Sequence, residues 1–193
     1  MGTSKTKGIT PSSPQRFLVD AGAVWLDYGL PTERLLGATR GGNVFSITQN
    51  IREMPMDGAR GPVKGAERII ESKATLVANL IEITADNIVL MIPAAKKTDY
   101  PSSIGKTHDS ITRDADIVDA NYITNIALVG KVQGALEDFI GLLYNALPTS
   151  NVDFKTVDKD EAVVAVTFTA HFDPNDMDTE PWEIRSPLIV AGT

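Results

Sequence analysis

The sequence predicts a mainly β protein with one short helix and long hairpin loops. Apolar and polar residues alternate with a period of two in several separate segments, and clusters of glycine and proline interrupt the alternation. Only one segment shows a clear helix start and stop. With 193 residues, 42% of them hydrophobic and 22% charged, the chain has the length and composition of one folded domain.

Alternation at 23–28 predicts a first strand, and two longer strands are expected at 43–54 and 68–83. Between the longer strands, Asp57–Gly65 contains three glycines and one proline. These strands are therefore expected to form a long hairpin with a large, mobile tip. Their apolar faces hold Phe45, Ile47 and Ile51 in the first strand, and Ile70, Ala74, Leu76, Ala78 and Leu80 in the second.

A short helix is expected after this hairpin, because Thr84 can cap it, Ala85–Met91 fill it and Pro93 prevents its extension. Residues 94–118 predict a long loop or an exposed hairpin. Strand alternation returns at 122–131 and 161–172.

Residues 135–147 are ambiguous, since their apolar positions fit a period of 3.6, which by itself favours a helix. At the other end of the chain, residues 1–16 are rich in polar residues, glycine and proline. This composition predicts a flexible N-terminal arm ahead of a single domain at 17–193.

The charge of the chain argues against a nucleic-acid-binding protein. Eighteen Lys and Arg residues against 25 Asp and Glu residues give a net charge of −7. A surface that grips phosphates needs the opposite sign. The acidic residues are concentrated in the last third, and the start of the chain lacks the apolar stretch of a signal peptide, so a protein made in a cytoplasm is expected.

Catalytic and metal sites are not predicted. The chain has no cysteine and two histidines, His108 and His171, without a second His or Cys at metal-ligand spacing. Ser103–Thr107 resembles the end of a phosphate-binding loop, but Tyr100 stands where the loop needs glycine. The acidic segment Asp173–Glu180 is interpreted as a turn, with a calcium loop as the alternative. No enzyme activity and no cofactor are expected.

Four stretches resemble the major tail tube proteins of long-tailed bacteriophages and prophages with non-contractile tails. The most specific words are Gly-Ala-Thr-Arg-Gly-Gly-Asn at 37–43 and Asp-Gly-Ala-Arg-Gly-Pro-Val-Lys-Gly at 57–65. The resemblance extends over about residues 21–185 and is carried by Ala21–Gly29, Leu36–Asn43, Ile51–Gly65 and Val166–Ile184.

The resemblance implies a β-sandwich or partial barrel with one flanking helix, and a strand at 135–147. It implies a homohexameric ring, with rings stacked into the tube that conducts the genome. The implied partners are other copies of the chain, the tape-measure, tail-tip and tail-terminator proteins, and double-stranded DNA that passes through the lumen without specific binding. No membrane partner is implied. The implied location is the virion tail, assembled in the cytoplasm of the host bacterium.

Within a tube, a strand of the inner sheet packs its apolar face on the core and leaves its polar face for the channel. If the long hairpin belongs to the inner sheet, the channel-lining residues are Ser46, Thr48, Asn50, Arg52, Glu71, Lys73 and Thr75. In the outer sheet, the same residues would face bulk solvent. Contacts between rings or subunits are expected at the hairpin tip, through Asp57, Arg60, Val63 and Lys64.

Two alternatives stay open. The tube of a contractile tail, a phage-derived bacteriocin or a type VI-like system shares the implied fold. A β-sandwich adhesin or carbohydrate-binding module belongs to another class and is expected to cluster exposed aromatic residues. Here the only tryptophans are Trp25 and Trp182, each in a strand-like context where burial is the default.

Overall fold

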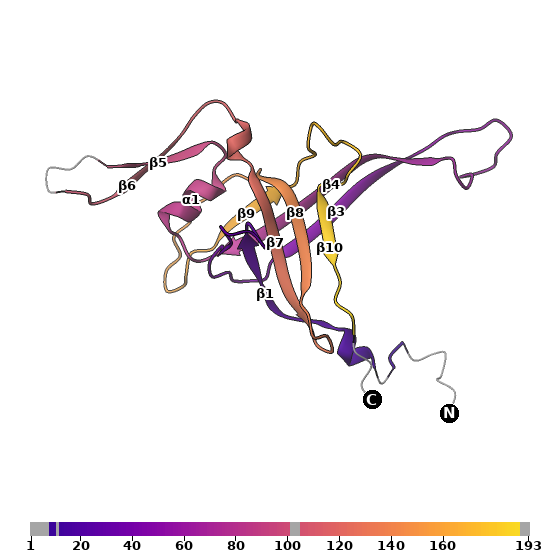
Figure 1. Cartoon of the computed structure of the whole chain (residues 1–193), viewed down its shortest axis with the longest axis horizontal. Helices are drawn as coiled ribbons and strands as arrows, with labels where there is room; N and C mark the ends of the chain where they lie inside the picture. The colour runs from indigo at the N-terminus through magenta and orange to yellow at the C-terminus, as the bar shows by residue number, and fades with distance from the viewer. Residues whose placement is uncertain (1–7, 11, 101–104, 190–193) are drawn as a thin grey trace.

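The computed structural model describes residues 8–10, 12–100 and 105–189 of this chain (Figure 1). It is mainly β, with a single α-helix in the described part. The elements are η1 (Ser13–Arg16), β1 (Leu18–Leu26), β2 (Arg34–Leu35), β3 (Val44–Glu53), β4 (Glu67–Leu80), α1 (Ala85–Met91), β5 (Ala95–Asp99), β6 (Asp109–Arg113), η2 (Asp119–Asn121), β7 (Ile123–Val132), β8 (Phe139–Pro148), β9 (Val164–Thr169) and β10 (Trp182–Arg185).

One strongly bent sheet makes up the body of the molecule. Its strands follow the order β2-β1-β7-β8-β9-β4-β3, all neighbours being antiparallel. Strand β8 belongs to both halves, because its first part pairs with β10 and its last two residues, Leu147 and Pro148, pair with β9. The sheet therefore folds over at β8 without closing, which confirms the predicted partial barrel.

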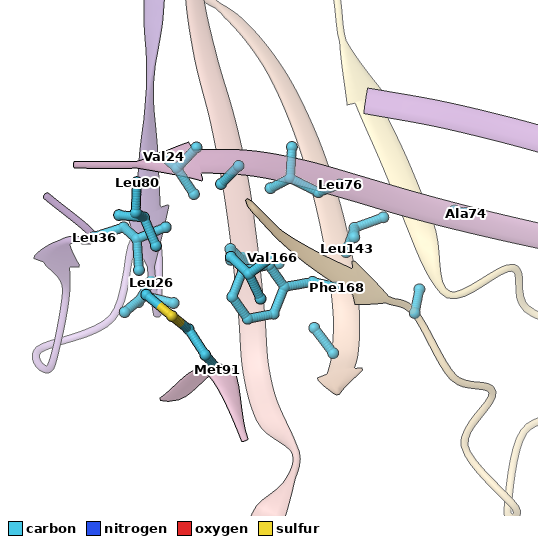
Figure 2. Close-up of a cluster of buried hydrophobic side chains, with 14 of the residues drawn as sticks. Val24, Leu26, Leu36, Ala74, Leu76, Leu80, Met91, Leu143, Val166 and Phe168 are labelled. Atoms are coloured by element: carbon cyan, nitrogen blue, oxygen red, sulfur yellow. The ribbon is translucent and has the colours of Figure 1, made fainter. Parts of the chain in front are cut away.

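The two halves of the sheet face each other across the core. A side chain at Gly141 in β8 would come within 3.0 Å of the ring of Phe45 in β3, although these strands are not neighbours in the sheet. Glycine at this position allows the halves to approach closely. Figure 2 shows the resulting core, in which Leu143 of β8 and Phe168 of β9 lie among side chains from β1, β4 and α1.

Helix α1 confirms the sequence prediction at both ends. Thr84 is the N-cap, and its hydroxyl accepts a hydrogen bond of 3.2 Å from the Asn87 backbone N–H. The helix ends at Met91, two residues before Pro93, and the Met91 side chain is fully buried in the core. The Asn87 side chain donates to the carbonyl of Glu82, so the helix is fixed to the chain that leaves β4.

Residues 139–148 form a strand, as the resemblance implied, despite their helical period. Leu142 and Leu143 are both buried although successive residues of a strand point to opposite faces, so β8 is covered on both faces here. A strand covered on both faces does not show a period of two, so periodicity could not identify it.

Two hairpins project from opposite sides of the body (Figure 1). The hairpin of β3 and β4 is the long one that the sequence predicted. The region 94–118 contains the second, formed by β5 and β6, so the exposed-hairpin alternative is confirmed there. Of the predicted arm, Ser13–Arg16 form a 3-10 helix that is held to the β7–β8 turn, since Gly134 N–H donates to the Gln15 carbonyl at 2.8 Å. Residues 1–7 and 11 of that arm lie outside the described residues.

Strand β10 is attached to β8 by a side-chain network as well as by the ladder. The Tyr144 hydroxyl donates to Glu183 Oε2 at 2.7 Å, and Arg185 donates to both carboxylate oxygens of Glu183. The guanidinium of Arg185 and the phenol of Tyr144 lower the pKa of Glu183 from its ordinary value of 4.5 to about 2. The carboxylate stabilises the fold as long as it stays charged.

The Glu183 network predicts a specific acid sensitivity. A depressed folded-state pKa contributes stability above the ordinary value of 4.5, and this contribution is lost as the pH falls towards about 2. We expect Glu183→Gln to lower the free energy of unfolding at pH 7 by less than about 1 kcal/mol, because the pair is largely exposed to solvent. The variant should lose less stability than the wild type between these pH values. Urea unfolding at several pH values, with Glu137→Gln as the control, measures the difference. Parallel acid profiles would contradict the prediction.

Candidate functional site

The predicted channel residues of the long hairpin lie together on one face of the sheet. The β3–β4 register places Ser46 opposite Thr75, Thr48 opposite Lys73 and Asn50 opposite Glu71. Phe45 and Ile47 alternate with these residues and pack on the core, so the polar set faces away from it. Thr48 Oγ1 also donates to the Lys73 carbonyl across the ladder at 3.2 Å.

Electrostatically, this polar face is close to neutral. Up to the pair Asn50 and Glu71 it carries one cation, Lys73, and one anion, Glu71, among hydroxyl and amide side chains, and Arg52 at its outer end is a second cation. The net charge of −7 of the chain therefore resides elsewhere. A sheet face with this charge neither attracts phosphates through a cluster of cations nor repels them strongly.

The structure adds residues to this face that the sequence analysis missed. Val77 lies opposite Thr167, and Asn79 lies opposite Ala165, so β9 continues the face beyond β4. At its margin the hydroxyl groups of Thr149 and Thr169 lie 2.7 Å apart. The alternation at 161–172 already indicated that β9 extends this face, because every second residue of that segment faces away from the apolar side.

The part of the hairpin that projects beyond the body, residues 51–53 and 67–70, is called the stem here. It departs from the predicted alternation. The register shifts between Asn50, which lies opposite Glu71, and Ile51, which lies opposite Ile69, so Ile70 is an extra residue in β4. Ile51 stays on the side of Phe45 and Ile47, because the extra residue is in β4, but the prediction that Ile51 and Ile70 pack on the core is wrong. Ile51, Ile69 and Ile70 are 49%, 59% and 58% exposed, because the stem overhangs the core and the bulge turns it. Arg52 lies past this bulge, at the outer end of the polar face.

The tip of the hairpin is folded around a small apolar pocket of about 410 Å³. Met54 N–H donates to the Ala66 carbonyl, and Ala66 N–H donates to the Val63 carbonyl, both at 2.9 Å. Of the predicted contact residues, Val63 lines the pocket, and Asp57, Arg60 and Lys64 are exposed around it. The hollow leaves apolar side chains of the tip uncovered, as in surfaces that contact another protein. The mobility of the tip stays a prediction.

The remaining described candidates of the sequence analysis make contacts within the chain, and residues 103 and 104 of the Ser103–Thr107 segment lie outside the described residues. Asn175 N–H donates to Asp173 Oδ1 at 2.8 Å, which confirms the turn at the start of the acidic segment. His171 packs edge-on against Tyr122, and His108 against Tyr100. Within the described residues, no group of three or more His, Cys, Asp or Glu side chains is arranged to hold a metal ion.

Comparison with known proteins finds similarity among solved structures. No protein-family model matches this sequence, and no curated protein matches it. Among solved structures, the chain is similar to one described as "Tail of empty GTA particle computed with helical refinement, C6 symmetry". The TM-score is 0.47 at 12% identity, over 79% of this chain and 92% of that chain. This similarity is too low to carry a functional inference. In the described part of this chain, no helix combines the length and hydropathy needed to cross a membrane.

Proposed function

We propose that this chain is the structural subunit of a phage-type tail tube, in which hexameric rings stack around a channel for double-stranded DNA. The observation that carries the proposal is the β3–β4 hairpin. It combines a polar face turned away from the core with a projecting stem whose isoleucines stay about half exposed in the described chain. Strand β3 also ends the sheet, so one of its edges is free to pair with another copy. The sequence words that resemble tail tube proteins include this same tip.

In this proposal, the polar face of β3 and β4 lines the channel up to the bulge, and Arg52 lies beyond the bulge on the stem. A lining of hydroxyl and amide groups with balanced charges suits a channel that DNA must cross without being held. The tip residues Asp57, Arg60, Val63 and Lys64 make contacts between rings or subunits. The subunit is not an enzyme, its partners include tape-measure, tail-tip and tail-terminator proteins, and it resides in the virion tail after assembly in the bacterial host.

Thiol labelling tests both the assembly and the lining. The chain has no cysteine, so Thr48→Cys introduces a single thiol on the polar face. With a reagent too bulky to enter a closed tube, we expect rapid labelling of free subunits and at least tenfold slower labelling of long tubes. Negative-stain microscopy and sedimentation velocity establish which species is present.

Thr156→Cys is the matched control, because Thr156 is exposed in the loop between β8 and β9, outside the β3–β4 hairpin. It should label equally in subunits and tubes. Equal labelling of Thr48→Cys in both states would place the polar face outside. A chain that stays monomeric at every concentration, also with tail-tip and tape-measure proteins, would refute the assembly itself.

A further inference from the structure

The stem of the β3–β4 hairpin carries two pairs of like charges in directly opposite positions. Arg52 lies opposite Arg68, and the next pair is Glu53 opposite Glu67. Like charges directly opposite each other weaken a pair of strands, whereas Arg opposite Glu stabilises it. The arrangement is therefore unfavourable for the hairpin of a single chain.

The two pairs lie on opposite faces of the stem. Successive residues of a strand point to opposite sides, so the arginine pair is on one face and the glutamate pair on the other. The pocket at the tip agrees with this assignment, because Glu53 and Glu67 line it and Arg52 and Arg68 do not. One face of the stem is basic, and the other is acidic beside an apolar hollow.

Nothing in the described chain neutralises these four charges. All four residues are exposed, and none of them forms an ion pair with another described residue. Two other arginines of the described chain do form ion pairs, Arg40 with Asp160 and Glu161, and Arg185 with Glu183. The stem charges are thus available to a partner.

We infer that the stem is a two-faced contact between copies of this chain, in which Arg52 and Arg68 of one copy pack against Glu53 and Glu67 of the next. Charge complementarity selects a second copy, because one segment supplies both signs in equal number. A contact between two different faces is heterologous and therefore repeats from copy to copy. The inference rests on the proposed self-assembly and assigns it a specific contact. The bulge at Ile70 adds local twist, which turns the stem relative to the polar face of the sheet.

Two variants give the stem a single sign of charge. R52E/R68E carries glutamates on both faces, and E53R/E67R carries arginines on both. Each variant alone should need at least a tenfold higher concentration than the wild type to assemble, because its two faces repel each other. An equimolar mixture should assemble like the wild type, since the two variants can alternate, and alternation closes in a ring with an even number of subunits. The fourfold exchange R52E/E53R/E67R/R68E should restore assembly of a single chain.

Sedimentation velocity at low and high salt measures these outcomes, and circular dichroism follows the fold of each variant. The defects should shrink at high salt, where charges are screened. If the wild type assembles and either single-signed variant assembles at the same concentration, the inference is wrong and the proposed function stands. Unchanged assembly of the variants is also the result expected if Arg52 and Arg68 bind DNA phosphates and not a second copy of the chain. A mixture that fails to co-assemble also overturns the inference. A wild type that never assembles refutes the proposed function and this contact with it.

Discussion

Replacing Phe168 by alanine is expected to lower the free energy of unfolding by about 3 to 5 kcal/mol. The Phe168 side chain is 0% exposed and lies at the centre of the core (Figure 2). Its strand, β9, pairs with β4 on one side and with the end of β8 on the other, so the ring packs where the two halves of the sheet meet. A cavity there removes contacts from both halves at once. Since a domain is stable by only about 5 to 15 kcal/mol, this loss is a large fraction of the total.

Urea unfolding followed by circular dichroism measures this effect. Phe154→Ala is the matched control, because the same atoms are removed from a side chain that is 55% exposed, in the loop between β8 and β9. That variant should change the free energy of unfolding by no more than about 0.5 kcal/mol. A loss below about 1 kcal/mol for Phe168→Ala would contradict the description of this core.

Replacing Ile51, Ile69 and Ile70 together by threonine is expected to weaken assembly at least tenfold and to leave the single subunit folded. The three side chains are half exposed around the bulge of the stem, so folding buries only part of each. Covering the remainder in a contact between copies would stabilise that contact by roughly 2 to 4 kcal/mol in total. Its loss should raise the concentration needed for assembly at least tenfold. Threonine keeps the β-branched shape that strands favour.

The comparison is made by sedimentation velocity for assembly and by urea unfolding for the subunit. Ile117→Thr serves as the control, since Ile117 is 50% exposed and lies outside the hairpin. We expect that variant to assemble like the wild type. Unchanged assembly of the triple variant would show that the stem isoleucines face solvent in the assembled state, which argues against the stem as a contact.

Much of the fold was predictable because its elements are specified by local chemistry. Thr84 and Pro93 mark the limits of α1 through hydrogen bonding and backbone sterics, which depend on few neighbours. The alternation in β3 and β4 predicted which residues face the core within the body, since one face of each strand is buried there. The polar face of the candidate site was predicted for the same reason.

The sequence by itself determined the mainly β composition, the long hairpin with its tip, the helix and the polar face of β3 and β4. Only the tertiary structure decided three points. Strand β8 is covered on both faces, so its residues show no period of two, and its identity depends on its neighbours. The bulge at Ile70 depends on which residues pair across the hairpin. The like-charge pairs Arg52–Arg68 and Glu53–Glu67 arise from that same register, and a register is a relation between two strands that neither strand encodes alone.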